Sequence, residues 1–590
     1  MNFCIKKATR NSVPIMLGAA LALALTSCGK SDLRSHRQIR KHAPQNSQDV
    51  GVMVQGVADE DVAQMLDQNP EAQARVINSK HGIYEIFNLE PSTLRAEWPE
   101  AQIVRNRFFQ TFENKVLPSM EERMMMLAET VNTGGDKLEQ CVEDLKSPTP
   151  EIEVTQSSED ISDQVMDLGG DFTLSSGKST AHPDHPSDLK VGWLVMAPQG
   201  SKKGREIFFA QSIKYQPDAY GMYNILMVVQ DSRKVCAGAS FEVIVTGNKD
   251  FVGNDVNVDD ILKQFDRKTF THLPEVHADE AQTEAKGQGV LIAVIDTGVN
   301  YNHAALVKNI WTNKKEIPGN NIDDDGNGQI DDITGYDFVN NDGSPYDDQG
   351  HGSHVAGLAA SSFFGLAPKA QIMAIKGLGP AGGDIASIVG GIYYAVDNGA
   401  KVLNMSFGNY GPPHPAMVQV MDYAEAKDVV ILAAAGNGHP TLGTGLDTDK
   451  VANFPSALPH DNIVAIAAKD TKNMLAPYSN YGIQTVDVAA PGGNAPDDVI
   501  VSSFLDNPDD VAFIGMSGTS MATPIVSGVA ALMLSANPTL KASDVKKILM
   551  TSGPQVQGLD KFIKSGRNVD ALAAVQAAKA MLPLAVGSIQ

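Results

Sequence analysis

The sequence predicts a three-part chain whose C-terminal half is an α/β domain with a mainly parallel sheet. From residue 281 onward, apolar strands alternate with Gly- and Ala-rich helical segments, which is typical of a parallel sheet covered by helices. Residues 148–247 contain short alternating strands separated by turn residues, which favours a β-sandwich. Residues 49–107 follow a β-α-β-β-α-β order, a ferredoxin-like arrangement whose third strand is weakly marked.

The composition fits a multidomain globular protein and excludes several other classes. Of 590 residues, 43% are hydrophobic and 20% are charged, so the chain can bury a sizeable core. The formal net charge of −23 argues against nucleic-acid binding, because a binder must neutralise phosphates with clustered Lys and Arg. The 52 glycines follow no collagen period. The only long apolar run lies near the N-terminus, which excludes a polytopic membrane protein.

Residues 1–27 are expected to be an export signal. A basic start at residues 6–10 precedes an apolar run at 13–25 that is short for a membrane span. The run ends in Leu-Thr-Ser-Cys-Gly, which resembles the lipobox of bacterial lipoproteins. The resemblance implies that Cys28 is lipidated and anchors the chain to a membrane. It places the protein in the bacterial cell envelope, at the outer membrane or cell surface, or released from it. A plain secretory signal is the alternative.

The remaining segments are interpreted from their composition. Residues 28–48 are polar and basic and form a tether. Residues 108–147 are interpreted as a helical connector, and residues 248–280 as a polar linker to a catalytic domain at 281–580. Two cysteines, Cys141 and Cys236, remain for a disulfide in an oxidising compartment, with two separate thiols as the alternative.

A first chemical motif ends the apolar strand at 290–295 with Asp296-Thr297-Gly298. The carboxyl end of a strand is where α/β sheets place their sites. Asp-Thr-Gly is also the signature of aspartic proteases, but those need two such carboxylates sharing a proton, and no second copy is present. By itself, Asp296 is equally consistent with a turn cap.

A second motif, at 350–357, carries His351 at the start of a helix of small residues, which can pack close to the sheet. His354 follows three positions later, so a metal site is a competing interpretation. Zinc hydrolases of that kind use H-E-x-x-H with a glutamate base. No glutamate occurs in this segment, which disfavours the metal site.

A third motif is a Gly-rich turn at 515–524 that delivers Ser520 to a helix N-terminus. That terminus supplies a positive partial charge and N–H groups beside the hydroxyl. An ordinary capped helix start is the alternative. The G-x-S-x-G elbow of other α/β hydrolases is absent at Ser520, which disfavours an esterase.

Taken together, in the order Asp, His, Ser, these motifs resemble the subtilisin-like serine peptidases. A serine hydroxyl is a weak nucleophile until a base removes its proton, and a buried aspartate holds the histidine in the required tautomer. The resemblance implies that Asp296 orients, His351 is general base and then acid, and Ser520 forms an acyl-enzyme. It implies protein or peptide substrates and no cofactor for catalysis. An inactive surface-binding protein of the same fold is the alternative, which the filled catalytic positions disfavour.

Further positions follow from the same resemblance. Asn437, after Gly436, matches the asparagine whose amide stabilises the oxyanion. The glycine itself and the stretch Ser406, Phe407 and Gly408 match the family's substrate-binding backbone, where a substrate pairs as an added strand. Ser353 stands where the family usually has threonine. The two are close in chemistry, and we expect no loss of activity.

The two N-terminal modules also resemble known ones. Residues 49–107 resemble the inhibitory propeptide of the subtilisin-like family, which implies a zymogen inhibited by its own propeptide. Residues 148–247 resemble Ig-like or PKD-like modules.

An oxygen-rich loop runs from Asn321 to Asp332. Its acidic positions have the spacing of calcium loops, but Thr334 occupies the place where an EF-hand needs glutamate. Carboxylates this close repel one another unless a cation lies among them. We therefore expect a structural calcium ion, with a solvated acidic loop as the alternative. The candidate ligands are Asp323, Asp325, Asn327, Gln329, Asp331 and Asp332.

Overall fold

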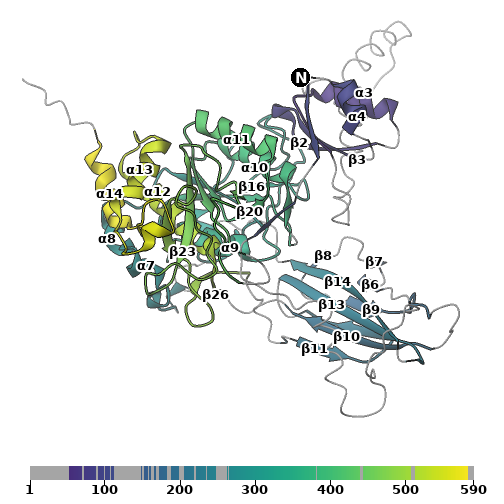
Figure 1. Ribbon diagram of the computed structural model, residues 1–590. Helices are drawn as coiled ribbons and strands as arrows, with labels where there is room; N and C mark the ends of the chain where they lie inside the picture. The colour runs from purple at the N-terminus through teal and green to yellow at the C-terminus, as the bar shows by residue number, and fades with distance from the viewer. Residues whose placement is uncertain are drawn as a thin grey trace, which may run out of the picture. The chain divides into compact units, whose positions relative to one another are not determined.

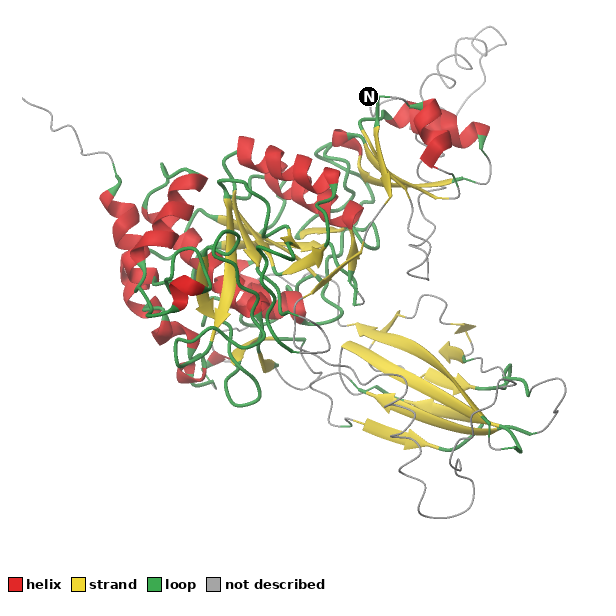
Figure 2. Cartoon of the chain, viewed as in Figure 1, coloured by secondary structure: helices red, strands yellow, loops and turns green. Residues whose placement is uncertain are grey.

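The structure, a computed structural model, describes most residues within 52–111, 152–246 and 262–582, with short gaps in each range. The described residues fall into two compact units, one ending at Arg107 and one beginning at Phe108. The expected signal peptide and tether, with Cys28, lie outside the described residues, as does Cys141. Figure 2 draws the segments that are not described in grey.

The first unit has four strands and two helices in the order β-α-β-β-α-β (Figure 1). The elements are β1 (Val52–Gln55), α3 (Asp59–Gln68), β2 (Gln73–Asn78), β3 (Ile83–Phe87), α4 (Pro91–Glu97) and β4 (Gln102–Arg105). The sheet order is β2-β3-β1-β4, and its recorded pairs are antiparallel. Helix residues Met65 and Leu94 share a core with sheet residues Val54 and Tyr84. Strand β2, the second in chain order, is the one that the sequence marks least, and not the third strand as expected.

Two sheets face each other between residues 153 and 246, over a shared apolar core around Trp193. One sheet has the order β11-β10-β13-β14-β8 and the other β12-β9-β6-β7. The strands are β6 (Glu153–Gln156), β7 (Glu159–Asp160), β8 (Val165–Asp167), β9 (Phe172–Ser175), β10 (Lys190–Met196), β11 (Arg205–Phe208), β12 (Ser212–Tyr215), β13 (Gly221–Gln230) and β14 (Cys236–Thr246). Alternating side chains such as Val191, Trp193 and Val195 enter the core, as the period of two requires.

A seven-stranded sheet forms the centre of the C-terminal half, in the order β16-β17-β15-β19-β21-β23-β24 with every pair parallel. Its strands are β15 (Leu291–Asp296), β16 (Gly335–Asp337), β17 (Gln371–Lys376), β19 (Val402–Met405), β21 (Val430–Ala434), β23 (Ile463–Lys469) and β24 (Val488–Pro491). Most of their residues are buried, which explains the continuous apolar runs in the sequence.

Helices cover this sheet (Figure 1). They are α9 (His351–Ala360), α10 (Ile385–Asp397), α11 (Pro415–Ala426), α12 (Thr519–Ala536), α13 (Ala542–Ser552) and α14 (Ala571–Ala580). Helix α12 packs against β19, β21, β23 and β24 and also contacts α9. Within the described residues, it alone is long and apolar enough to cross a membrane, and 83% of that stretch is buried inside the protein, so we interpret it as a core helix.

The expected polar linker at 248–280 is wrong for its second half. Residues from 262 onward include η3 (Arg267–Thr269), α7 (His272–Glu275) and α8 (Ala278–Glu284). Phe270, Leu273 and Val276 are buried in the same core as the parallel sheet. Burying these apolar side chains outweighs the polar composition that suggested a linker.

The start of the expected helical connector at 108–147 also differs. Phe108–Thr111 is a strand, β5, and the rest up to residue 147 lies outside the described residues. Aromatic and β-branched residues favour extended backbone. This strand pairs with β18 (Gly383–Asp384) and β20 (Phe407–Tyr410), and β20 also pairs with β22 (Asn453–Phe454).

Candidate active site

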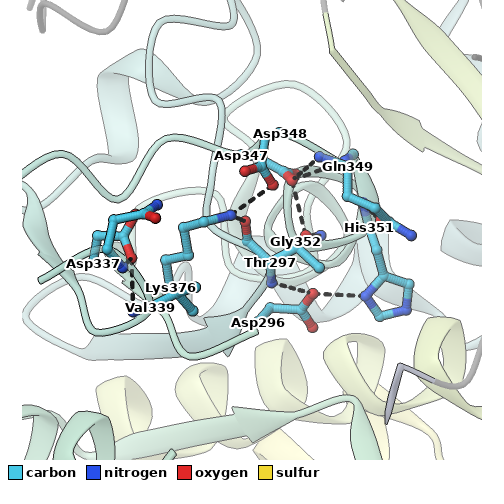
Figure 3. A network of polar contacts seen from close by, with 12 residues as sticks. Asp296, Thr297, Asp337, Val339, Asp347, Asp348, Gln349, His351, Gly352 and Lys376 are labelled. Carbon is cyan, nitrogen blue, oxygen red and sulfur yellow. Dashed lines mark hydrogen bonds and ion pairs between the residues drawn. The ribbon is translucent and has the colours of Figure 1, made fainter. Parts of the chain in front are cut away.

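Asp296 and His351 form a buried pair at the carboxyl edge of the parallel sheet (Figure 3). Asp296 is the last residue of β15, and His351 is the first residue of α9. The ring nitrogen Nδ1 of His351 lies 2.7 Å from Asp296 Oδ1. The same oxygen accepts the backbone N–H of Thr297 at 2.8 Å. The carboxylate therefore holds one side of the imidazole and leaves Nε2 on the other side.

Gly350 sets the entry of the chain into α9. Its φ is +100°, in the left-handed region that favours glycine. A Cβ at this position would lie 2.0 Å from the ring of Phe504, so a side chain has no room. The preceding turn can therefore place His351 directly above Asp296.

Ser520 lies in the first turn of α12 and is buried. Its hydroxyl donates to the backbone carbonyl of Ser406 at 2.9 Å. In return, the hydroxyl of Ser406 donates to the Ser520 carbonyl at 3.0 Å. A hydroxyl has one proton to donate, so proton transfer to a base requires Ser520 to turn away from this carbonyl.

Asn437 follows β21 and contacts the residue before the serine. Its Oδ1 accepts two hydrogen bonds from Thr519, from the backbone N–H at 2.9 Å and from Oγ1 at 2.8 Å. This fixes the side-chain amide with Nδ2 on the side away from Thr519. Gly436 has a φ of +101°, and a Cβ there would meet Asn480 Nδ2 at 2.5 Å. The bend at this glycine directs Asn437 toward the start of α12.

The expected substrate-binding stretch is already paired with another strand of the chain. Phe407 and Gly408 in β20 lie opposite Thr111 and Gln110 of β5, and the two strands are antiparallel. On the other side of β5, Gly383 and Asp384 pair with Phe109 and Phe108. An extended segment thus lies between two strands, as a peptide does when it binds by strand addition.

Two sets of hydrogen bonds join sequence-predicted residues. Asp296 and His351 share one hydrogen bond, and Ser520, Asn437 and Ser406 are joined through Thr519 and the backbone. The helices that begin with these groups, α9 and α12, pack against each other.

The acidic loop gathers only part of the expected ligand set. One carboxylate oxygen each from Glu316, Asp323 and Asp325 lies within 4.8 Å of the others. Glu316 is 6% exposed, and its Oε2 has no hydrogen-bond partner among the described residues. Burial raises the pKa of Glu316, and the charges of Asp323 and Asp325 raise it further. A group of hard oxygens at this spacing could hold a cation.

The other expected ligands have different partners. Asp332 accepts hydrogen bonds from Tyr394, Asn327 and Asn313, and burial raises its pKa to about 7. Asp331 accepts the backbone N–H groups at positions 320 and 321. Asn327 Oδ1 accepts the backbone N–H of Gln329. Neither Asp331 nor Asp332 belongs to the described acidic cluster with Glu316.

Several residues at the site carry no strong signal in the sequence. Glu316 lies outside the acidic run, and only its position just before that loop could have suggested it. Thr519 was visible inside the serine motif, but its contact with Asn437 depends on the fold. The partner strand β5 comes from a distant part of the chain, and no local pattern reveals the pairing.

Comparison with known proteins covers the C-terminal half. The model of the Subtilase family, Peptidase_S8, matches residues 287–568. Thermitase of Thermoactinomyces vulgaris is 33% identical over 309 residues, which cover 51% of this chain and 94% of thermitase. Subtilisin DY of Bacillus licheniformis is 32% identical over 309 residues, covering 51% of this chain and 97% of that protein.

A solved structure of proteases from Pseudoalteromonas arctica PAMC 21717 is 28% identical, covers 53% of this chain and 97% of its own, and has a TM-score of 0.43. The family assignment rests on the sequence relatives, two of which are spanned almost end to end. The chain belongs to the subtilase family and is a subtilisin-like serine endopeptidase.

Proposed function

We propose that this endopeptidase cleaves peptide bonds through Asp296, His351 and Ser520. His351 takes the Ser520 proton on Nε2 as the hydroxyl attacks the substrate carbonyl, and later gives it to the leaving amine. Asp296 holds the ring through Nδ1 and stabilises the imidazolium. The observation that carries this assignment is the 2.7 Å contact between Asp296 Oδ1 and His351 Nδ1, with both groups buried.

Asn437 and the backbone N–H of Ser520 are proposed to stabilise the oxyanion of the tetrahedral intermediate. Two hydrogen bonds from Thr519 to Asn437 Oδ1 support this role, because they direct Nδ2 away from Thr519. Preorganised donors of this kind act without reorganising during the reaction. The substrate backbone is proposed to pair with Phe407 and Gly408, and Ser406 and Gly436 shape the adjoining walls.

A fluorophosphonate probe tests the nucleophile. We expect the parent to be labelled and Ser520→Ala to be neither labelled nor active. Ser535→Ala, in the same helix, is the matched control and should keep full labelling. Labelling that persists in Ser520→Ala would overturn the assignment, and a parent that takes no label would favour an inactive binding protein.

We further propose that the chain is made as a zymogen and that the unit at 49–107 is its inhibitory propeptide. The position of β5 supports this, because it follows that unit directly and occupies the backbone edge of β20. The described pairing ends with Thr111 opposite Phe407, the residue after Ser406, whose carbonyl accepts the Ser520 hydroxyl. The proposed cut is therefore the bond between Phe112 and Glu113.

N-terminal sequencing checks this cut. The purified parent should begin at Glu113, and Ser520→Ala should remain uncut. Phe112→Pro should block or displace the cut, because proline cannot supply the backbone N–H that such a strand uses. An active protein that is uncut would contradict the zymogen proposal, and an N-terminus elsewhere would contradict only the register.

A calcium ion is proposed at the acidic loop, held by Glu316, Asp323 and Asp325. The buried Oε2 of Glu316 supports it, because a buried carboxylate oxygen without a partner is costly. When bound, the ion would neutralise the loop and stabilise it without taking part in catalysis.

Thermal unfolding with and without a chelator measures the effect of the ion. EDTA should lower the Tm of the parent, and excess calcium should restore it. Glu316→Gln should reduce that calcium-dependent shift, whereas Glu284→Gln, an acid outside the loop, should not. Equal Tm values with calcium and with EDTA would contradict the site.

Export and anchoring remain proposals for segments outside the described residues. We propose that residues 1–27 are removed, that Cys28 carries lipid, and that the protein belongs to the cell envelope until the cut releases the peptidase. Mass spectrometry of the uncut Ser520→Ala variant should find a lipid-modified Cys28. We also propose a disulfide between Cys141 and Cys236, which thiol titration of the denatured, unreduced protein tests. The two-sheet region is proposed to be an Ig-like or PKD-like module.

A further inference from the structure

Asp347 accepts an unusually large number of hydrogen bonds behind the catalytic histidine. It is fully buried and lies four residues before His351. Its Oδ1 accepts Thr297 Oγ1 and the backbone N–H groups of Gln349 and Gly350, at 2.8, 3.0 and 2.8 Å. Its Oδ2 accepts the backbone N–H and the hydroxyl of Ser353, at 2.7 and 2.6 Å. The five donors come from both sides of the Asp296–His351 pair.

Thr297 is the link between the two sides (Figure 3). Its hydroxyl donates to Asp347 and accepts the N–H of Gly352, the residue after His351, at 2.9 Å. Its own backbone N–H donates to Asp296 Oδ1. The turn that carries the aspartate is thereby tied to the helix that carries the histidine.

Lys376 adds a buried positive charge on the far side of this turn. Its Nζ donates to the carbonyl of Thr297 at 2.8 Å and to Asp348 Oδ1 at 2.6 Å, and the side chain is 1% exposed. Burial alone would lower the pKa of Lys376, but the carboxylates of Asp348, Asp337 and Asp347 raise it above its ordinary value. The lysine is therefore charged and fixes the carbonyl of Thr297.

We propose that Asp347, backed by Lys376, is a positioning residue that fixes the direction of the hydrogen bond between Asp296 and His351. It acts through Thr297 and the first turn of α9 and does not touch the substrate. The proposal rests on the proposed roles of Asp296 and His351. Asp347 and Lys376 thus add buried charged groups behind the site that fix the orientation of the His351 ring.

Thr297→Val is the most selective test. Valine keeps the shape of threonine but removes the hydroxyl that joins Asp347 to Gly352. We expect kcat on a peptide substrate to fall about 10- to 100-fold, because small misplacements of catalytic groups cost that much, while KM changes less than about twofold. Thr297→Ser keeps the hydroxyl and should restore kcat to within about threefold of the parent.

A spectroscopic signature separates positioning from stability. The His351 Nδ1 proton, held against Asp296, should give a far-downfield proton resonance in the parent and in Thr297→Ser, and should shift or broaden in Thr297→Val. Thr448→Val is the matched control. It removes another buried hydroxyl, one that contacts Tyr481 and Thr485, so it should lower Tm without changing kcat or the resonance.

Asp347→Asn gives a second, larger perturbation, because an amide cannot accept five donors. A Thr297→Val enzyme with parental kcat and resonance but lower Tm would overturn the positioning role, whether or not Asp347→Asn folds. Ser520→Ala distinguishes this failure from that of the proposed triad: if Ser520→Ala stays active, the triad itself is wrong.

Discussion

The two halves of the active site are held by different forces. Around Asp296 and His351, the contacts run through buried charges, with Asp347 and Lys376 beside them. Around Ser520, the contacts join neutral groups: hydroxyls, amides and backbone carbonyls. The half with Asp296 and His351 is held by buried charged groups, and the half with Ser520 by neutral hydrogen bonds.

The difference matches what each half must do. A buried carboxylate has to remain charged beside the histidine. Fixed hydrogen-bond donors and a buried cation offset the desolvation cost of that charge. The serine has to turn from the Ser406 carbonyl toward the base, and a neutral hydrogen bond of about 1 kcal/mol is easily exchanged. Variants that damage one half should therefore differ in kind from variants that damage the other.

The largest effect is expected for Lys376→Met. Methionine cannot form the ion pair that Lys376 makes with Asp348. Leaving Asp348 buried without that positive charge typically costs about 3–5 kcal/mol. Chemical denaturation should show a loss of this size in the free energy of unfolding. Lys450→Met removes an exposed pair with Asp447 and should leave the free energy of unfolding nearly unchanged, because solvent screens such a pair. Equal losses of unfolding free energy in Lys376→Met and Lys450→Met would mean that the buried charges do not stabilise this half of the site.

Acid sensitivity sharpens the comparison, because α9 also carries a neutral histidine. Burial lowers the pKa of His354 to about 3, and the charge of His351 lowers it further. The folded form thus stays neutral while the unfolded chain takes up a proton below about pH 6.5. The free energy of unfolding should fall as pH drops from about 6.5 toward 3, by up to about 1.4 kcal/mol per pH unit for this group.

Urea titrations of the parent and His354→Gln at several pH values check this slope. Asp332 and Asp337, whose pKa values are raised by burial, act in the opposite sense over part of the range, so the difference between variant and parent isolates the histidine. Glutamine can still donate to the carbonyls of Ile500 and Ile514 that His354 contacts. Identical pH slopes in the two proteins would contradict a neutral His354.

In the neutral half, Thr519→Val should have a smaller effect. It removes the hydroxyl that holds Asn437 Oδ1 and accepts the N–H of Gly436, while the backbone bond to Asn437 remains. Of these two contacts, the one that orients Asn437 is worth about 1 kcal/mol, so kcat should fall about fivefold with KM nearly unchanged. Thr519→Ser should restore kcat. A Thr519→Val enzyme with parental kcat would show that the backbone bond alone orients the amide.

The same contrast explains what the sequence could predict. Runs of buried apolar residues and the motifs around Asp296, His351 and Ser520 are local, so the parallel sheet and the order of the chemical groups were readable. The role proposed for Asp347 was not, because its five donors, which include the distant Thr297, converge on it only after folding. Glu316 was missed for the same reason, because a single glutamate becomes a candidate metal ligand only when the folded loop brings Asp323 and Asp325 close to it.

Composition misled where short elements have a polar outer face. Residues 262–280 looked like a linker, although a few apolar side chains among them enter the main core. At Asp331 and Asp332, like charges at close spacing suggested ligands, but both carboxylates accept hydrogen bonds from within the loop or from α10. The spacing of acidic residues in the sequence shows where charges gather, but it does not show which hydrogen-bond donors the fold brings to them.

The smallest effect is expected for Ser353→Thr, the substitution that the resemblance to the subtilisin-like peptidases suggests for Ser353. Its hydroxyl donates to Asp347 and accepts the backbone N–H of Asn300 at 2.8 Å, so both of its hydrogen-bonding functions are used. Ser353→Thr keeps that hydroxyl and both of its hydrogen bonds, so kcat should stay within about twofold of the parent value. Ser353→Ala loses both bonds and should cost about 1–3 kcal/mol of unfolding free energy. If threonine costs as much as alanine, the added methyl group does not fit, and the serine is required by packing around α9 and not merely tolerated as a substitute.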